Sequence, residues 1–159
     1  MSSSIIEQIE NSTVFINGAP YEPSDDDEVK RMVSLLEIKQ GEKAVDIGSG
    51  DGRVVIAMAE EGAVAYGFEN DRYLVKESRR NIQRAKMSHS AFIKQTDFWD
   101  ENYNLFDKII VFQFGTVMKR LEKKLESELR DGTYVVSQFW KFPNWKYVKK
   151  ISDVYLYIK

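Results

Sequence analysis

The sequence predicts an α/β fold, a doubly wound, mostly parallel, Rossmann-like sheet of seven strands with an antiparallel edge strand. Short and almost wholly apolar segments alternate with amphipathic segments of helical periodicity. This alternation is typical of a parallel sheet that helices cover on both faces. A glycine-rich turn also follows the first inner strand, where open α/β sheets bind their ligands. The length of 159 residues fits one domain of this kind.

The N-terminal part of the chain differs from the rest. We divide the sequence into an arm over the expected cofactor site, residues 1–24, and a single Rossmann-like domain, residues 25–159. Within the arm, residues 13–16 could form a short strand. Ser24 is the expected N-cap of the first helix, because its hydroxyl can accept a hydrogen bond from a free backbone N–H there. The helical spacing of apolar residues predicts that this helix ends near Lys39.

Strands and helices then alternate to the end of the chain. Apolar runs predict strands at residues 44–47, 64–68, 92–93, 109–112, 134–136, 147–148 and 154–157. Amphipathic runs predict helices at residues 53–61, 71–87 and 117–129. Because only a short connection joins the last two strands, one of them is expected to run antiparallel at the edge of the sheet.

The composition argues against several classes of protein. The chain has 23 basic and 25 acidic residues and a net charge of -2, without the positive excess expected of a nucleic-acid coat protein or a polybasic membrane binder. It has no cysteine and one histidine, so no metal site is expected. The absence of a long apolar run or a secretory leader predicts a cytoplasmic protein without a membrane segment.

The glycine-rich turn carries the strongest indication of chemistry. Residues 46–52 read Asp-Ile-Gly-Ser-Gly-Asp-Gly, and glycines at such a turn allow positive φ angles and close approach of a ligand. A dinucleotide would need a helix N-terminus open to its pyrophosphate, but Asp46 and Asp51 would repel phosphate. The same two carboxylates would attract a cation. The turn therefore predicts binding of S-adenosylmethionine, which carries an ammonium and a sulfonium, and makes a nicotinamide dehydrogenase a weaker alternative.

The next two strand ends supply groups that match the rest of this cofactor. Glu69 follows the turn by about 20 residues and can accept hydrogen bonds from both ribose hydroxyls. Asp97 can accept from the adenine amino group, and Phe98 can lie against the adenine ring. Taken singly, these residues would more often be helix caps, loop acids or core residues. Their order at successive strand ends favours the cofactor interpretation.

Five segments carry a family resemblance over essentially the whole chain. They are residues 20–24, 45–53, 67–70, 97–98 and 135–139. In these segments the chain resembles the class I, seven-β-strand methyltransferases. It is most similar to the archaeal broad-specificity protein lysine methyltransferases and to the FAM173-type lysine methyltransferases.

The resemblance implies a cofactor site and an activity. The residues that it implies in binding S-adenosylmethionine are Tyr21, Ser24, Asp46, Gly48, Ser49, Gly50, Gly52, Glu69, Asn70, Asp97 and Phe98. The segment from Tyr21 to Ser24 would cross the methionine end. The implied reaction is methyl transfer to lysine ε-amines of many proteins, including small basic chromatin proteins.

Three residues are predicted to act on the substrate lysine. Tyr21 and Gln113 can accept hydrogen bonds from the amine, and Trp140, beside Phe139, can face a cationic lysine head with its ring. Trp140 could equally be a packing residue at a strand end. A methyltransferase for RNA or a small molecule, or a non-catalytic module that binds the cofactor, remains an alternative. The expected partners are proteins with exposed lysines, without stable nucleic-acid binding, and a monomer is expected.

Overall fold

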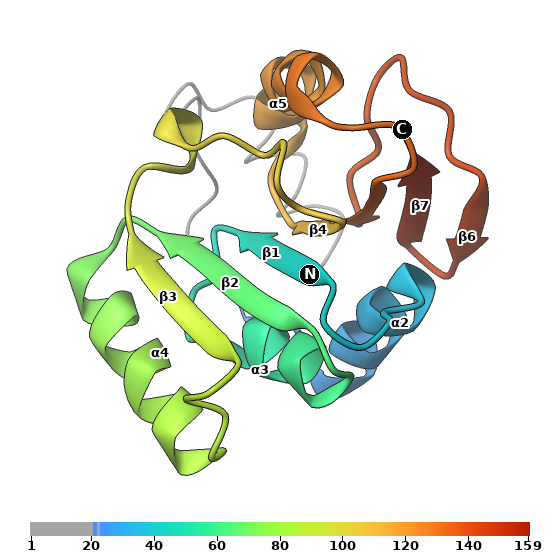
Figure 1. Ribbon diagram of the computed structural model, residues 1–159. Helices are drawn as coiled ribbons and strands as arrows, with labels where there is room; N and C mark the ends of the chain where they lie inside the picture. Colours follow the sequence, from blue (N-terminus) through green and yellow to red (C-terminus); the bar gives the residue numbers. More distant parts are fainter. Residues whose placement is uncertain (1–20, 22) are drawn as a thin grey trace.

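The computed structural model describes Tyr21 and residues 23–159; most of the arm, including the strand predicted at residues 13–16, lies outside the described residues. Figure 1 shows a twisted sheet with helices on both faces. The helices are α2 (Asp26–Leu36), α3 (Arg53–Glu60), α4 (Arg72–Arg84) and α5 (Gly115–Glu128), with a 3-10 turn, η2 (Phe98–Asp100). The strands are β1 (Lys43–Ile47), β2 (Val64–Glu69), β3 (Ala91–Gln95), β4 (Lys108–Val111), β5 (Tyr134–Gln138), β6 (Lys149–Ile151) and β7 (Val154–Ile158).

The seven strands lie in the order β3-β2-β1-β4-β5-β7-β6, which confirms the predicted fold class. Strands β1 to β5 pair in parallel, and β7 pairs antiparallel with both β5 and β6. The antiparallel strand is thus β7, and β6 forms the edge beyond it. Only Ser152 and Asp153 separate these two strands, and such a short connection permits only antiparallel pairing.

The strand order reverses at β1, which lies between β2 and β4. At the carboxyl end of β1, Ile47 is level with Phe68 of β2 and with Val111 of β4. The segments that follow these three strands therefore emerge together at one edge of the sheet. An open α/β sheet binds ligands at this switch point, because the connections there diverge to opposite faces.

Two apolar clusters hold the layers together. Helices α2, α3 and α4 pack on one face of the sheet, and α5 packs on the other with the aromatic segment after β3 (Figure 1). Successive residues of β1 alternate between the clusters: Ala44 belongs to the first, and Val45 and Ile47 belong to the second. This burial on both faces explains why the inner strands read as continuous apolar runs.

The start of α2 differs from the sequence prediction. The N-cap is Asp25 rather than Ser24: Oδ1 of Asp25 accepts from the backbone N of Glu28 at 2.8 Å, and Oε2 of Glu28 accepts from the backbone N of Asp25 at 2.9 Å. This reciprocal pair satisfies two free donors, which the Ser24 hydroxyl alone could not do. The helix ends at Leu36 rather than near Lys39, since Glu37 takes a left-handed conformation with φ 49°.

None of the helices in the described part of the chain has the length and apolar character that crossing a bilayer requires.

Candidate functional site

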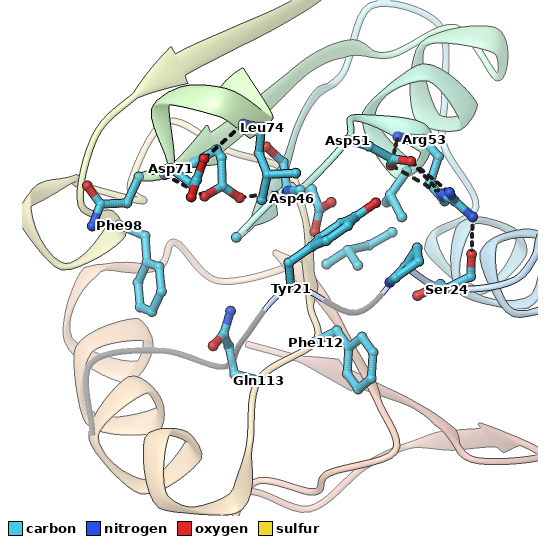
Figure 2. Close-up of a pocket in the computed structure, with 18 of the residues that line it drawn as sticks. Tyr21, Ser24, Asp46, Asp51, Arg53, Asp71, Leu74, Phe98, Phe112 and Gln113 are labelled. Carbon is cyan, nitrogen blue, oxygen red and sulfur yellow. Dashed lines mark hydrogen bonds and ion pairs between the residues drawn. The ribbon is translucent and has the colours of Figure 1, made fainter. Parts of the chain in front are cut away.

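A cavity of about 530 Å³ opens at the carboxyl edge of the sheet, over the switch point (Figure 2). It is lined by the turn after β1, by the ends of β2 and β3, by the segment after β4, and by residues that precede α2. Of the residues predicted to bind a cofactor, the cavity brings together Tyr21, Ser24, Asp46, Gly48, Ser49, Gly50, Glu69, Asn70, Asp97 and Phe98.

The turn after β1 needs its glycines for two reasons. Gly48 and Gly50 have φ angles of 80° and 52°, a region in which side chains with a Cβ are strained. A Cβ at Gly48 would also lie 2.5 Å from Nε2 of Gln113, and one at Gly50 would lie 2.6 Å from the ring of Tyr21. Neither position has room for a side chain, so the backbone itself forms the cavity floor.

Gly52 lies at the end of the turn, just before α3. It does not line the cavity, and a Cβ on it would lie 3.0 Å from Cβ of Ser78 in α4. Its φ of 84° precedes the first residue of α3. Gly52 therefore allows α3 to pack closely against α4, and its contact with a cofactor stays a prediction.

Glu69 joins the glycine turn to the start of α4. Its Oε2 accepts from the backbone N of Gly50 at 2.8 Å, and its Oε1 accepts from the backbone N of Asp71 at 2.8 Å. A carboxylate oxygen can accept more than one hydrogen bond, so both atoms retain acceptor capacity toward a ligand. The two backbone donors fix the carboxylate at the cavity wall, where it could accept from paired ribose hydroxyls.

Asp46 gives the cavity its strongest electrostatic feature. Only 5% of this residue is exposed, and burial raises its pKa well above the usual range, with further increases from the negative charges of Glu69 and Asp51. Burial without a compensating charge disfavours the ionised carboxylate. A cationic ligand would supply that charge, so the site fits the ammonium or sulfonium of the expected cofactor.

Ser49 provides a second observation that the cavity suits a polar ligand. Its side chain is buried beside Gly67, whose lack of a Cβ leaves room for it. Among the described residues, no group makes a hydrogen bond with the Ser49 hydroxyl. Because Ser49 lines the cavity, a ligand with polar groups could satisfy this hydroxyl.

The end of the cavity beside β3 is aromatic. Oδ1 of Asp97 accepts from the backbone N of Trp99 at 3.0 Å and so caps η2. Phe98 is buried against Trp99, with ring centroids 4.8 Å apart. The hydroxyl of Tyr103 donates to the carbonyl of Phe98 at 2.7 Å, which holds this turn in place. A flat apolar ring and a neighbouring carboxylate suit a purine with an amino group.

The segment after β4 brings Gln113 into the cavity lining, and its predicted role toward the substrate amine stays a prediction. Gln113 is 4% exposed, and its Nε2 donates to the carbonyl of Ile47 at 3.3 Å. This bond orients the amide across the end of β1. Phe112 and Phe114 line the cavity beside it; the sequence prediction assigned them no role, although they flank Gln113 at a strand end.

The two aromatic residues predicted to act on substrate lie in different places. Tyr21 lines the cavity, and burial and the nearby charge of Asp51 raise the pKa of its hydroxyl. Trp140 does not line the cavity and packs against Phe139, with ring centroids 5.4 Å apart. A role of either residue toward a lysine stays a prediction.

The lining also contains residues that sequence reasoning missed. Arg53, Asp71 and Leu74 were not predicted to line the cavity, although they follow the glycine turn and Glu69 closely in sequence. Across residues 21 and 23–159, no three histidine, cysteine, aspartate or glutamate side chains are grouped so that they could hold a metal ion.

The strand order and the acid-lined cavity at its switch point are typical of the class I, S-adenosylmethionine-dependent methyltransferases. Within this class the chain belongs to the ANTKMT methyltransferase domain family, whose model matches residues 46–149. This finding agrees with the family resemblance of the sequence.

Individual relatives support this membership. The ATP synthase C-subunit lysine N-methyltransferases of Mus musculus and Xenopus laevis are 40% and 38% identical to the chain over 126 residues, which are 79% of this chain but 51% and 55% of the relatives. The chain thus spans about half the length of these animal relatives. The protein-lysine N-methyltransferase of Saccharolobus islandicus is 30% identical over 154 residues, covering 91% of this chain and 96% of the relative.

A solved structure is similar over nearly the same length. The RNA methyltransferase from Salinibacter ruber, in complex with S-adenosyl-L-homocysteine, superposes with a TM-score of 0.83 and 27% sequence identity. The match covers 86% of this chain and 93% of that one.

Proposed function

We propose that the chain is an S-adenosylmethionine-dependent methyltransferase that acts on lysine ε-amines of proteins. The observation that carries the proposal is the buried Asp46 beside Glu69 at the floor of a cavity over the switch point. This site suits a cationic nucleoside. Lysine as the acceptor is supported by the Saccharolobus islandicus relative, a protein-lysine N-methyltransferase that aligns with this chain over nearly its full length.

The residues that line the cavity imply one orientation of the cofactor in it. Phe98 and Asp97 would take the adenine at one end, and Glu69 would take the ribose hydroxyls in the middle. The amino-acid end would then lie toward Asp46 and Tyr21, where carboxylate charge is concentrated. This order leaves the reacting centre near Gln113.

The bound cofactor supplies an electrophilic methyl group on a sulfonium. The chain must then align a neutral amine with it and exclude water. Lysine has an ordinary pKa of about 10.4, and a pocket that removes water from the amine lowers it. Phe112 and Phe114 would supply such apolar surroundings, and the amide of Gln113 would orient the amine. Alignment of this kind can contribute on the order of 7–11 kcal/mol to the barrier reduction.

The finer parts of the proposal concern substrates and setting. We propose broad substrate specificity that includes small basic chromatin proteins, for a monomer in the cytoplasm. The support is the family resemblance and the architecture: residues 21 and 23–159 form one sheet with its helices and contain no second domain that could select a sequence around the lysine.

The test is to incubate the chain with methyl-labelled cofactor and separate pools of protein, RNA and small metabolites. We expect label in the protein pool, with mass spectrometry placing the methyl groups on lysines. Asp46→Asn should abolish the label, whereas Asp131→Asn, an equivalent change in an exposed turn, should not. A peptide array tests broad specificity, which would be wrong if one sequence context carried all the activity.

RNA is the second candidate substrate, because the Salinibacter ruber structure that superposes on this chain is an RNA methyltransferase. Label in the RNA pool alone would establish that alternative. Binding of S-adenosylhomocysteine without transfer to any pool would instead indicate a non-catalytic module.

A further inference from the structure

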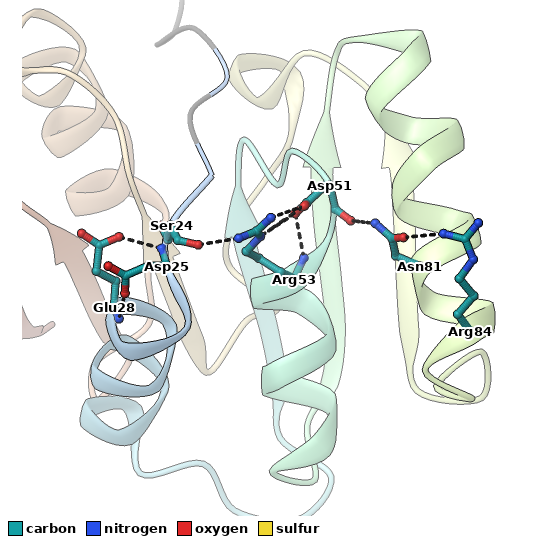
Figure 3. A network of polar contacts seen from close by, with 7 residues as sticks. All are labelled: Ser24, Asp25, Glu28, Asp51, Arg53, Asn81 and Arg84. Atoms are coloured by element: carbon teal, nitrogen blue, oxygen red, sulfur yellow. Dashed lines mark hydrogen bonds and ion pairs between the residues drawn. The ribbon is translucent and has the colours of Figure 1, made fainter. Parts of the chain in front are cut away.

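Arg53, at the start of α3, lies at the centre of a polar network beside the cavity (Figure 3). Its Nε lies 3.1 Å from each carboxylate oxygen of Asp51, and its Nη2 lies 2.7 Å from Oδ2 of the same residue. Its Nη1 donates to the carbonyl of Ser24 at 2.7 Å. One guanidinium therefore joins the glycine turn to the residues that precede α2.

The network includes Tyr21 on one side and α4 on the other. The ring of Tyr21 lies against Gly50, and its hydroxyl is close enough to Asp51 for that carboxylate to raise its pKa, after the larger effect of burial. From α4, Nδ2 of Asn81 donates to the backbone carbonyl of Asp51 at 2.9 Å (Figure 3). Asp51 is thus fixed by α3 and α4, and Arg53 connects that rigid base to Ser24, three residues after Tyr21.

Arg53 also sets the charge that the cavity presents. Burial alone would raise the pKa of Asp51, but the hydrogen bonds and positive charge of Arg53 outweigh it and hold that pKa below its usual range. Asp51 is therefore ionised and paired. Asp46, which is buried, and Glu69 also line the cavity, and neither forms an ion pair with a described basic residue, so a cationic ligand could take that place.

The residues that Arg53 holds form one particular end of the cavity. Tyr21, Pro23 and Ser24 line it, and in Figure 2 Tyr21 and Ser24 lie away from Phe98. Since Phe98 marks the adenine end in the proposed function, Tyr21 and Ser24 would border the amino-acid end of the cofactor.

We infer that Arg53 is a positioning residue that holds Tyr21 and Ser24 as the wall around the amino-acid end of the cofactor. The inference rests on the proposed function for the identity of the cofactor. It assigns Tyr21 to this wall, because its ring lies against Gly50 and Tyr21 lines the cavity three residues before Ser24, whose carbonyl Arg53 holds. Arg53 itself acts through the residues it holds and does not take part in methyl transfer.

The role requires a guanidinium rather than a positive charge alone. The planar group directs Nε and Nη2 to one carboxylate and Nη1 to the Ser24 carbonyl at the same time. A lysine ammonium is a compact point charge on a flexible chain and cannot reproduce this fork. Arg53→Lys therefore preserves charge and removes the connection.

The experiment measures binding of two nucleosides by calorimetry. S-adenosylhomocysteine contains the amino-acid end, whereas 5′-methylthioadenosine lacks it. For Arg53→Lys we expect about a tenfold loss of affinity for S-adenosylhomocysteine, the size of one lost charge-assisted hydrogen bond, and less than about a twofold change for 5′-methylthioadenosine. The matched control is Arg80→Lys, since Arg80 is exposed on α4 and does not line this cavity; it should change neither affinity.

A second variant keeps the test decisive if Arg53→Lys does not fold. Tyr21→Phe removes the hydroxyl that lies near Asp51 and keeps the ring against Gly50, so it should cause a smaller loss of affinity for S-adenosylhomocysteine and again leave 5′-methylthioadenosine binding unchanged. Equal affinities in variant and wild type, or equal losses for both nucleosides, would overturn the inference. If the variants lose affinity for S-adenosylhomocysteine alone, but the wild-type protein transfers label to no protein, the proposed function fails and the role of Arg53 stands.

Discussion

Asp46→Asn should affect the free protein and the complex in opposite directions. The carboxyl is 5% exposed, and its pKa is raised well above the usual range, first by burial and then by Glu69 and Asp51. A carboxyl whose pKa is higher in the folded than in the unfolded state lowers stability progressively as the pH rises from the unfolded-state pKa to the folded-state pKa. Asparagine has nearly the same shape without the charge. The ligand-free variant should therefore be more stable than wild type at neutral and alkaline pH.

The loss of the Asp46 carboxylate sets the size of both effects, on stability and on cofactor affinity. Each pKa unit of the rise corresponds to about 1.4 kcal/mol, and each 1 kcal/mol raises Tm by about 2–4 °C in a chain of this size. In the complex, the variant loses a charged partner for the cofactor, which is worth about 1.5–3 kcal/mol. The affinity for S-adenosylhomocysteine should accordingly fall by about 10- to 150-fold.

Thermal unfolding with and without S-adenosylhomocysteine tests the predicted gain in stability, and calorimetry tests the predicted loss of affinity. As the pH falls from the raised pKa of Asp46 toward the ordinary pKa of an aspartate, wild-type stability should recover, and the difference in stability between wild type and variant should shrink. Asp131→Asn, in an exposed turn, is the control. A ligand-free variant that is less stable than wild type, with unchanged affinity, would refute the reasoning.

Three further changes test other parts of the structure. Gly50→Ala should cost about 1–2 kcal/mol of stability for its left-handed backbone and also weaken S-adenosylhomocysteine binding, since the new Cβ displaces Tyr21; thermal unfolding and calorimetry measure both. Gln113→Ala should lower kcat and leave cofactor affinity within about twofold, if the amide orients the amine; equal losses in both would contradict this. Glu122→Ala should cost about 3 kcal/mol in urea unfolding, because buried Glu122 accepts from both nitrogens of Asn144, and a loss below about 1 kcal/mol would disagree.

Local patterns determined most of the fold. Continuous apolar runs mark inner strands because both faces of the sheet are covered, and helical spacing marks the segments that cover them. The glycine turn was recognisable because its backbone needs positive φ angles and close contacts, which only glycine provides. Asp46 and Glu69 could be predicted to meet, because parallel strands end at one edge of the sheet. The predicted helix ends were less accurate: the N-cap of α2 is Asp25 rather than Ser24, because Asp25 pairs with Glu28.

By itself, the sequence determined the strand and helix order, the edge at which the cavity opens and the acids that face it, since these depend on periodicity and on residues adjacent in the chain. Only the tertiary structure decided that Arg53 joins the glycine turn to Ser24, that the ring of Tyr21 lies against Gly50, and that Trp140 lies outside the cavity. These relations link segments far apart in the chain. Their distances are set by how the helices pack on the sheet, which no local pattern records.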